Sequence, residues 1–209
     1  MVWSLSLQLP EEPELLDHFL LAAGKSLYLS NGFEAKCSYL LRLMKISKHY
    51  VETNNVDATL QLAGTLSNSR LGASLCGLKS FPAYDATDIA RLNKAREARN
   101  FIAHKGADIG CLTVRGKNIV ENIKKLREEV TNLTDGDNLV SRWIYEIEET
   151  EPAPHGICQD YPCWVDRWVF RSIDEFLLDY SPIEKNETGT ERVLRMLKES
   201  PQHPDYVRP

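Results

Sequence analysis

The residues best suited to chemistry are an arginine, an asparagine and a histidine within one short stretch of the sequence. The stretch consists of Arg99-Asn100-Phe101-Ile102-Ala103-His104. An imidazole can accept and donate a proton near neutral pH, and a guanidinium offers phosphoryl oxygens a planar fork of hydrogen-bond donors. On a helix, Asn100 and His104 lie one turn apart on the same side. The stretch therefore has the groups needed to hold a phosphate and to move a proton.

A helix is expected to position these side chains. It begins near Asp85 or Thr87, because either side chain is a good N-cap, and it stops at Gly106, because glycine is favoured just past a helix end. The apolar positions of this helix form one stripe, which consists of Ile89, Leu92, Ala95, Ile102 and Ala103. Arg99 falls in the middle of the stripe, where a guanidinium is costly unless it is paired or used.

The position of Arg99 leaves two interpretations open. In the first, Arg99 and His104 act on a substrate. In the second, Arg99 pairs with Glu52 or another acid across a helical bundle, and His104 only caps its helix. Glu97 lies two residues before Arg99 and hence on a different face, so it is expected to point to solvent.

The stretch resembles the signature of the HEPN superfamily of small helical proteins. That signature is an arginine, usually followed directly by a polar residue, and a histidine a few residues later. Here the three positions are Arg99, Asn100 and His104, at the C-terminal end of an expected helix. The helical context that supports the resemblance extends over roughly residues 13–150. The resemblance implies an all-α fold, a HEPN-like antiparallel helical bundle, with a less regular C-terminal extension.

The resemblance also implies a function, which is RNA cleavage without a metal or cofactor. His104 would act on the proton of the 2′-hydroxyl or of the leaving group, Arg99 would stabilise the phosphate, and Asn100 would orient the phosphate or the imidazole. Attack by the 2′-oxygen leaves a 2′,3′-cyclic phosphate and spares DNA. HEPN domains commonly pair, which implies a homodimer with two motifs at one cleft. By analogy with members of the superfamily, the resemblance implies a toxin or defence effector, with an antitoxin or regulatory protein as a further partner.

One position departs from a pattern found in some HEPN toxins. These toxins have a tyrosine two residues after the histidine, which a partner nucleotidyltransferase can modify. This chain has Gly106 at that position, so no such modification is predicted. The remaining histidines are isolated in the sequence and are not expected to be catalytic; they are His18, His49, His155 and His203.

Charge is distributed unevenly along the chain. The formal net charge is −5, which alone argues against a nucleic-acid-binding protein. Residues 91–127, however, contain ten Lys or Arg and only three acids, whereas residues 128–209 contain eight Lys or Arg and eighteen acids. Such a basic segment can face a phosphate backbone locally. The residues expected to contact RNA are Arg96, Lys105, Arg115 and Lys117.

Hydrophobic spacing and turn residues predict a largely helical chain. The expected helices span residues 13–29, 33–52, 57–70, 85–104, 117–133, 138–149, 165–178 and 191–199. Breaks are expected at Asn31-Gly32, in a loop marked by Gly72, Gly77 and Pro82, at Asp135-Gly136, and in a linker marked by Pro152, Pro154, Gly156 and Pro162. A brief extended segment is expected around residues 112–114. In the third helix, Leu60, Ala63 and Leu66 are expected to face inward.

A second class of function, a non-catalytic helical interaction module, follows from two apolar features. The first is a narrow seam suited to a partner helix or to a second subunit, formed by Ile119, Ile123, Leu126, Val130 and Leu133. The second is an aromatic C-terminal helix with Trp164, Trp168, Phe170 and Phe176. Residues 1–150 are expected to form the bundle. Residues 151–209 are expected to pack on it as an extension, because so short a segment buries little core alone.

Composition and cysteine usage indicate the class of protein. Hydrophobic residues make up 43% and charged residues 26%, as in ordinary globular proteins. The five cysteines are odd in number and scattered, so buried reduced thiols are expected. His155, Cys158 and Cys163 supply only three ligands where structural zinc prefers four, so no metal is predicted. There is no secretory signal and no run approaching roughly 18 apolar residues, which predicts a cytoplasmic protein without membrane contact.

Overall fold

The computed structural model describes residues 13–79, 85–107 and 116–180. Over these ranges the chain is all-α, as predicted, and contains six helices and no strand. The helices are α1 (Pro13–Thr53), α2 (Val56–Thr65), α3 (Leu71–Leu78), α4 (Ala86–Lys105), α5 (Gly116–Glu149) and α6 (His155–Leu177).

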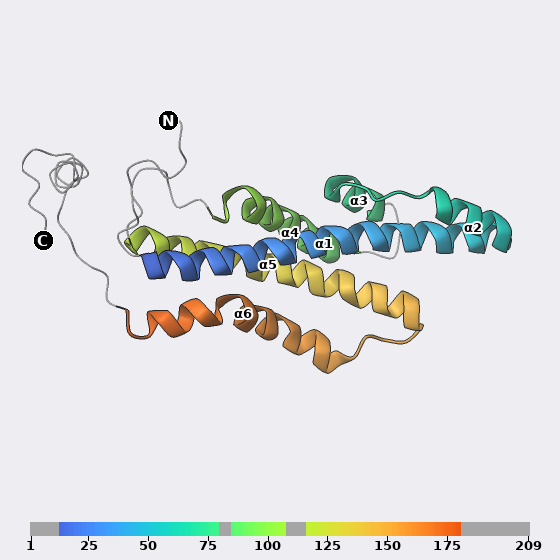
Figure 1. Cartoon of the computed structure of the whole chain (residues 1–209). Coiled ribbons are helices and arrows are strands. Elements are labelled where there is room, and N and C mark those ends of the chain that lie inside the picture. Colours follow the sequence, from blue (N-terminus) through green and yellow to red (C-terminus); the bar gives the residue numbers. More distant parts are fainter. Residues whose placement is uncertain (1–12, 80–84, 108–115, 181–209) are drawn as a thin grey trace, which may run out of the picture.

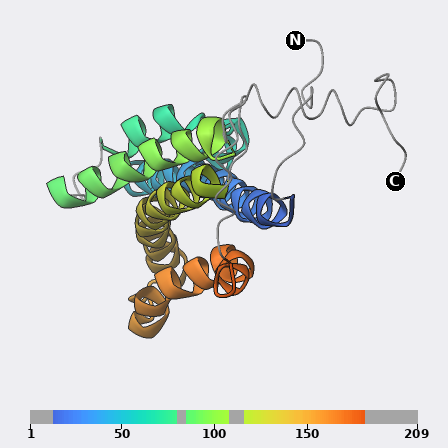
Figure 2. The ribbon, with the colours of Figure 1, turned by 90° about the vertical axis from the view of Figure 1, so that its left-hand side faces the viewer.

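The long helices α1 and α5 run side by side through the centre of the molecule (Figure 1). Helix α4 packs mainly on α5 and also crosses α1, while the short helices α2 and α3 lie against α1. Helix α6 packs on α1 and α5, on the side away from α4 (Figure 2). The candidate chemistry on α4 and the aromatic helix α6 are therefore separated by the α1–α5 pair.

The core is built from apolar stripes that these helices turn toward one another. From α1 it includes Phe19, Phe33, Cys37 and Leu40, and from α6 it includes Val165, Val169, Phe170 and Ile173. The seam of α5 contributes Ile119, Ile123, Leu126, Val130 and Leu133, each at most 4% exposed. The seam is therefore filled by helices of the same chain, and it is not a free surface for a second subunit.

Helix α1 continues without interruption through Asn31-Gly32, so the predicted break is wrong. A glycine inside a helix costs roughly 1 kcal/mol relative to alanine. Burial of one large side chain such as Phe33 contributes about 1.5–3 kcal/mol, and Phe33 is fully buried. Packing therefore outweighs the local cost, and α1 becomes a single helix of 41 residues.

Helix α5 is likewise continuous where a turn was predicted at Asp135-Gly136. A Cβ placed on Gly136 would lie only 2.3 Å from the Cβ of Ala95 on α4. The adjacent Asp137 is buried, and it accepts hydrogen bonds from Lys36 Nζ at 2.8 and 3.0 Å and from the Tyr161 hydroxyl. Glycine at this position lets α4 and α5 approach closely, and the following aspartate joins α5 to α1 and α6.

Replacing Gly136 with alanine is expected to destabilise the fold by about 1–3 kcal/mol, because a methyl group would be forced into a packed crossing. Urea unfolding followed by circular dichroism measures this cost. The control is Gly24→Ala on α1, where nothing lies within 4 Å of the new Cβ, and a gain of up to about 1 kcal/mol is expected. Adding Ala95→Gly should recover part of the loss; equal stability of Gly136→Ala and wild type would contradict this account of the crossing.

The chain between α1 and α4 also differs from the prediction. Helix α2 ends at Thr65, and the expected loop around Gly72 and Gly77 is instead α3. Leu60 is 65% exposed, so its predicted inward orientation is wrong. A Cβ on Gly77 would lie 2.8 Å from the Leu41 side chain, which shows that α3 packs tightly on α1. Gly77 therefore serves helix packing, whereas a Cβ on Gly72 would meet nothing within 4 Å.

Helix α6 begins at His155, well before the predicted start at residue 165, and it contains Pro162. Proline lacks the N–H that would bond the carbonyl four residues earlier, which here belongs to Cys158. The Asn138 side-chain amide of α5 donates to that same carbonyl oxygen at 2.7 Å. A tertiary hydrogen bond thus satisfies the carbonyl that Pro162 leaves free, and the helix continues through the predicted linker.

Several sequence predictions lie outside the described residues. They concern Pro82, the extended segment at residues 112–114, the helix at residues 191–199, and His203. The division into residues 1–150 and 151–209 stays a prediction, although α6 does pack on α1 and α5. Within the described part of the chain, no helix has the length and apolarity needed to cross a membrane.

Candidate functional site

Helix α4 begins and ends where the sequence predicted. Asp85 is its N-cap, and the Asp85 side chain accepts a hydrogen bond from the Asp88 backbone N–H at 2.8 Å. Gly106 is the C-cap, and its N–H donates to the Ile102 carbonyl at 3.2 Å. The inner face of α4 is fixed by four buried residues: Leu92, Ala95, Ala98 and Ile102. These anchors set the direction in which the last turns of α4 present their polar side chains.

The Arg99 side chain is only 21% exposed and forms an ion pair with Glu34 of α1. Nη2 of Arg99 donates to Glu34 Oε2, and Nη1 donates to Asn100 Oδ1 at 3.3 Å. The Arg99 Nε is buried and has no hydrogen-bond partner among the described residues. Arg99 therefore pairs with an acid across the bundle, as the second interpretation expected, and its action on a substrate stays a prediction. The acid is Glu34, whereas the suggested Glu52 lies beside Lys48.

His104 and Asn100 are both exposed, one turn apart on α4. His104 makes no hydrogen bond or ion pair with any described residue, so its imidazole is open to solvent and to a ligand. It does not cap its helix, because Gly106 takes that position. Glu97 is exposed, as predicted. The end of α4 therefore presents an accessible imidazole next to an amide that is hydrogen-bonded to a half-buried guanidinium.

Sequence reasoning did not identify Glu34 as part of this arrangement. Its Oε2 binds Arg99, and its Oε1 accepts a hydrogen bond from the Leu71 N–H at the start of α3, at 3.1 Å. Glu34 thus joins α1, α3 and α4. The sequence held one signal for Glu34, which is an acid placed between two core positions. Glu34 directly follows the core residue Phe33 and precedes the core residue Cys37 by one turn.

The expected RNA contacts are only partly described. Lys105 is exposed and Arg96 is half-buried, and neither forms an ion pair with a described residue. Arg115 lies outside the described residues, and the side chain of Lys117 is not described. Lys94, also on α4, is exposed and without an ionic partner in the described ranges. Cationic groups are thus available along α4, on the helix that carries the motif.

Other cations of the basic segment are already neutralised within the chain. Arg91 donates to both carboxylate oxygens of Asp135, at 2.8 and 2.7 Å. Lys125 pairs with two glutamates of its own helix, Glu128 and Glu129. Arg127 pairs with Asp166 and Asp174 of α6. The positive charge of this segment is therefore less available to a phosphate backbone than the sequence suggested.

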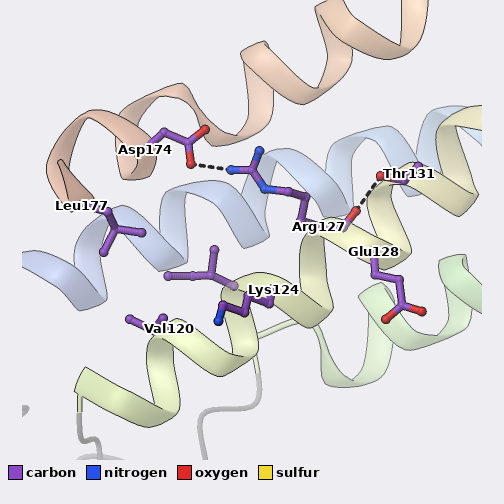
Figure 3. A pocket seen from close by; sticks show the side chains of 8 residues that line it. Val120, Lys124, Arg127, Glu128, Thr131, Asp174 and Leu177 are labelled. Carbon is purple, nitrogen blue, oxygen red and sulfur yellow. Dashed lines mark hydrogen bonds and ion pairs between the residues drawn. The ribbon is translucent and has the colours of Figure 1, made fainter.

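A hollow of about 510 Å³ lies between α5 and α6 (Figure 3). It is lined by Val120, Ile123, Lys124, Arg127, Glu128, Thr131, Asp174 and Leu177. The Arg127 guanidinium points to Asp174 across it, so the pair closes on itself. The motif of α4 does not line this hollow, and within the part of the chain that the structure describes, Asn100 and His104 are exposed at the end of α4.

The cysteines bear on the expectation of buried thiols and on metal binding. Cys37 is buried, and burial raises the pKa of its thiol, which keeps it protonated. Cys76 and Cys163 are exposed and Cys158 is half-buried, so the prediction of buried thiols is right only for Cys37 among the described cysteines. Over the ranges that the structure describes, no group of three or more His, Cys, Asp or Glu is placed to hold a metal ion.

Comparison of the chain with protein-family models, with curated proteins and with solved structures found no match. The resemblance to the HEPN superfamily therefore rests on the motif at Arg99, Asn100 and His104 and on its helical surroundings.

Proposed function

We propose that this chain is a metal-independent endoribonuclease that cuts single-stranded RNA through attack by the 2′-oxygen. Arg99, Asn100 and His104 form its site. The observation that carries the proposal is the arrangement at the end of α4: an exposed imidazole with no partner among the described residues stands one turn from an exposed amide that is hydrogen-bonded to an anchored guanidinium. These are the groups that phosphodiester cleavage needs, held on one rigid helix.

Each side chain has a distinct role in the proposed reaction. His104 accepts the proton of the 2′-hydroxyl, the 2′-oxygen attacks phosphorus, and the bond from phosphorus to the 5′-oxygen breaks. Arg99 stabilises the charge that builds on the phosphoryl oxygens, and Asn100 orients the phosphate. The products are a 2′,3′-cyclic phosphate and a 5′-hydroxyl. In a homodimer that brings two motifs to one cleft, a second imidazole would donate the proton that the leaving 5′-oxygen requires.

The proposed RNA contacts and biological role rest on the resemblance to HEPN-like helical bundles. Lys105 and Arg96 on α4, with Arg115 and Lys117, would contact the RNA backbone. The resemblance to the HEPN superfamily implies the biological role of a cytoplasmic toxin or defence effector, held in check by an antitoxin or regulatory protein. Arg127 pairs with Asp166 and Asp174, so acids of α6 already compete with RNA for cations of the basic segment.

Wild-type protein is expected to cleave a single-stranded RNA in the presence of EDTA, and to cleave the same sequence more slowly in a duplex. In-line attack by the 2′-oxygen requires a flexible sugar–phosphate backbone, which a duplex restrains. Gel analysis of the two labelled substrates gives both rates. Cleavage that disappears on addition of EDTA, or that is equally fast in duplex RNA, would contradict the proposed reaction.

A second candidate function, protein binding, is favoured by one specific observation. Trp164 and Trp168 of α6 are 52% and 45% exposed and stand in a hollow of about 410 Å³ beside Lys25 of α1. Exposed tryptophans are typical of interface hot spots. The α5 seam does not contribute, because it is buried. Protein binding would survive His104→Ala and be lost on joint Trp164→Ala and Trp168→Ala substitution, whereas RNA cleavage would respond in the opposite way.

A further inference from the structure

We infer that Glu34 is the positioning residue of this site: its carboxylate holds the Arg99 guanidinium so that one edge faces the phosphate of a bound RNA. The inference rests on the proposed function and extends it from α4 to α1. It is carried by the geometry that joins Glu34, Arg99 and Asn100.

The Arg99 guanidinium is held at two of its nitrogens. Nη2 donates to Glu34 Oε2, on the side of the bundle interior, and Nη1 donates to Asn100 Oδ1 at 3.3 Å, on the exposed side. Arg99 Nε is buried and has no partner among the described residues, so it cannot reach a ligand. The Nη1 edge, beside Asn100, is therefore the part of the fork that a phosphate can approach.

Partial burial makes this ion pair more than a surface contact. The side chains of Arg99 and Glu34 are 21% and 27% exposed. Partly desolvated charges interact more strongly and are less screened by salt than exposed ones. Without Glu34, the guanidinium would be left half-buried with no anion beside it, and it would be drawn toward solvent. Removal of the carboxylate should therefore displace the Arg99 guanidinium, although the arginine itself is unchanged.

Glu34 also has a structural contact, which the test must separate from its effect on Arg99. Glu34 Oε1 accepts from the Leu71 N–H at 3.1 Å, and one turn along α1 the Ser38 hydroxyl accepts from the Ser69 N–H at 3.0 Å. Both bonds attach the start of α3 to α1, but only Glu34 contacts Arg99. Ser38→Ala is thus a matched control that loosens the same attachment without touching the guanidinium.

The test is a double-mutant cycle on RNA cleavage with Glu34→Gln and Arg99→Ala. Glutamine keeps a carbonyl oxygen for the Leu71 N–H but removes the charge that holds Arg99. Glu34→Gln is expected to lower kcat about 10- to 100-fold, as for a misplaced catalytic group, with a much smaller change in KM. In the Arg99→Ala background the same substitution should have no further effect. Glu34→Asp, which keeps the charge, should recover part of the rate, and Ser38→Ala should cleave like wild type.

Each outcome of this cycle has a defined meaning. A loss on Glu34→Gln that is equally large in both backgrounds, or no loss at all, overturns the positioning role while leaving the proposed function intact. Unfolding of both Glu34→Gln and Glu34→Asp shows that the residue acts only on the fold, and it also overturns the role. A wild-type chain that leaves single-stranded RNA intact overturns the proposed function, and the inference falls with it.

Discussion

His104→Ala is expected to lower the rate of RNA cleavage by a factor of about 10² to 10⁴, the usual contribution of a general acid or base. The imidazole is exposed and has no partner among the described residues, so its removal should cost little stability. Initial rates on a labelled single-stranded RNA, measured with EDTA present, give the factor. A large loss of rate at unchanged stability would assign the effect to chemistry.

The control for this substitution is His155→Ala. His155 is another exposed histidine, and it begins α6, on the other side of the α1–α5 pair from α4. Its removal should leave the cleavage rate unchanged. Circular dichroism and light scattering should show the same fold and the same oligomeric state, expected to be a homodimer, for both variants. If folded His104→Ala protein cleaves as fast as wild type, the motif is not catalytic and the protein-binding function replaces it.

Arg99→Ala is expected to reduce cleavage by about 10²- to 10³-fold through lost stabilisation of charge on the phosphate. Arg99→Lys should recover little, since an ammonium does not replace a planar fork that contacts Glu34 and Asn100 together. Asn100→Ala should be milder, because the amide only orients. Rates of the three variants under the conditions used for His104→Ala test this ranking.

The Arg99 variants need a stability control, because the substitution leaves the half-buried Glu34 carboxylate without its cation. Arg91→Ala serves this purpose. Arg91 lies on the same helix and also pairs with an acid of a neighbouring helix, Asp135 of α5. Arg91→Ala should lower the free energy of unfolding while leaving the cleavage rate unchanged. If Arg91→Ala and Arg99→Ala lose activity in proportion to their loss of stability, Arg99 has no role in the chemistry.

The helix that carries the site could be predicted from sequence because its boundaries are set locally. Asp85 caps the first turn through a hydrogen bond to a residue three positions away, and Gly106 ends the last turn. Both signals depend on side-chain chemistry within a few residues. The apolar stripe between them also belongs to a single helix, so its spacing identified most of the buried face.

The missed features all depend on residues that are distant in the sequence. Asp135-Gly136 predicts a turn from local composition, but the role of Gly136 depends on Ala95 of another helix. Pro162 predicts a linker, but the helix tolerates it because Asn138 donates a hydrogen bond to the carbonyl that proline leaves free. Local helix propensities differ by only roughly 1 kcal/mol, so such tertiary contacts override them. The sequence pattern alone does not locate these contacts.

The candidate site also has one part that the sequence predicted and one part that it did not. The spacing of Asn100 and His104 on one helix followed directly from the sequence, and both side chains are exposed. The partner of Arg99 did not follow, because Glu34 reaches it only where α1 crosses α4. The sequence raised the possibility of an ion pair and named a different acid. A charged residue inside an apolar stripe thus predicted that a partner exists, but not which one.

The most direct test of the central claim is the chemistry of the cut. Wild-type protein is incubated in EDTA with a single-stranded RNA oligonucleotide and with the same oligonucleotide carrying 2′-deoxyribose throughout, and the product ends are identified by mass spectrometry. A ribonuclease centre at Arg99, Asn100 and His104 predicts 2′,3′-cyclic phosphate and 5′-hydroxyl ends from RNA, an intact deoxy oligonucleotide, and no products from folded His104→Ala protein. Intact RNA after incubation with folded wild-type protein, or equal cutting of the deoxy oligonucleotide, would contradict the claim.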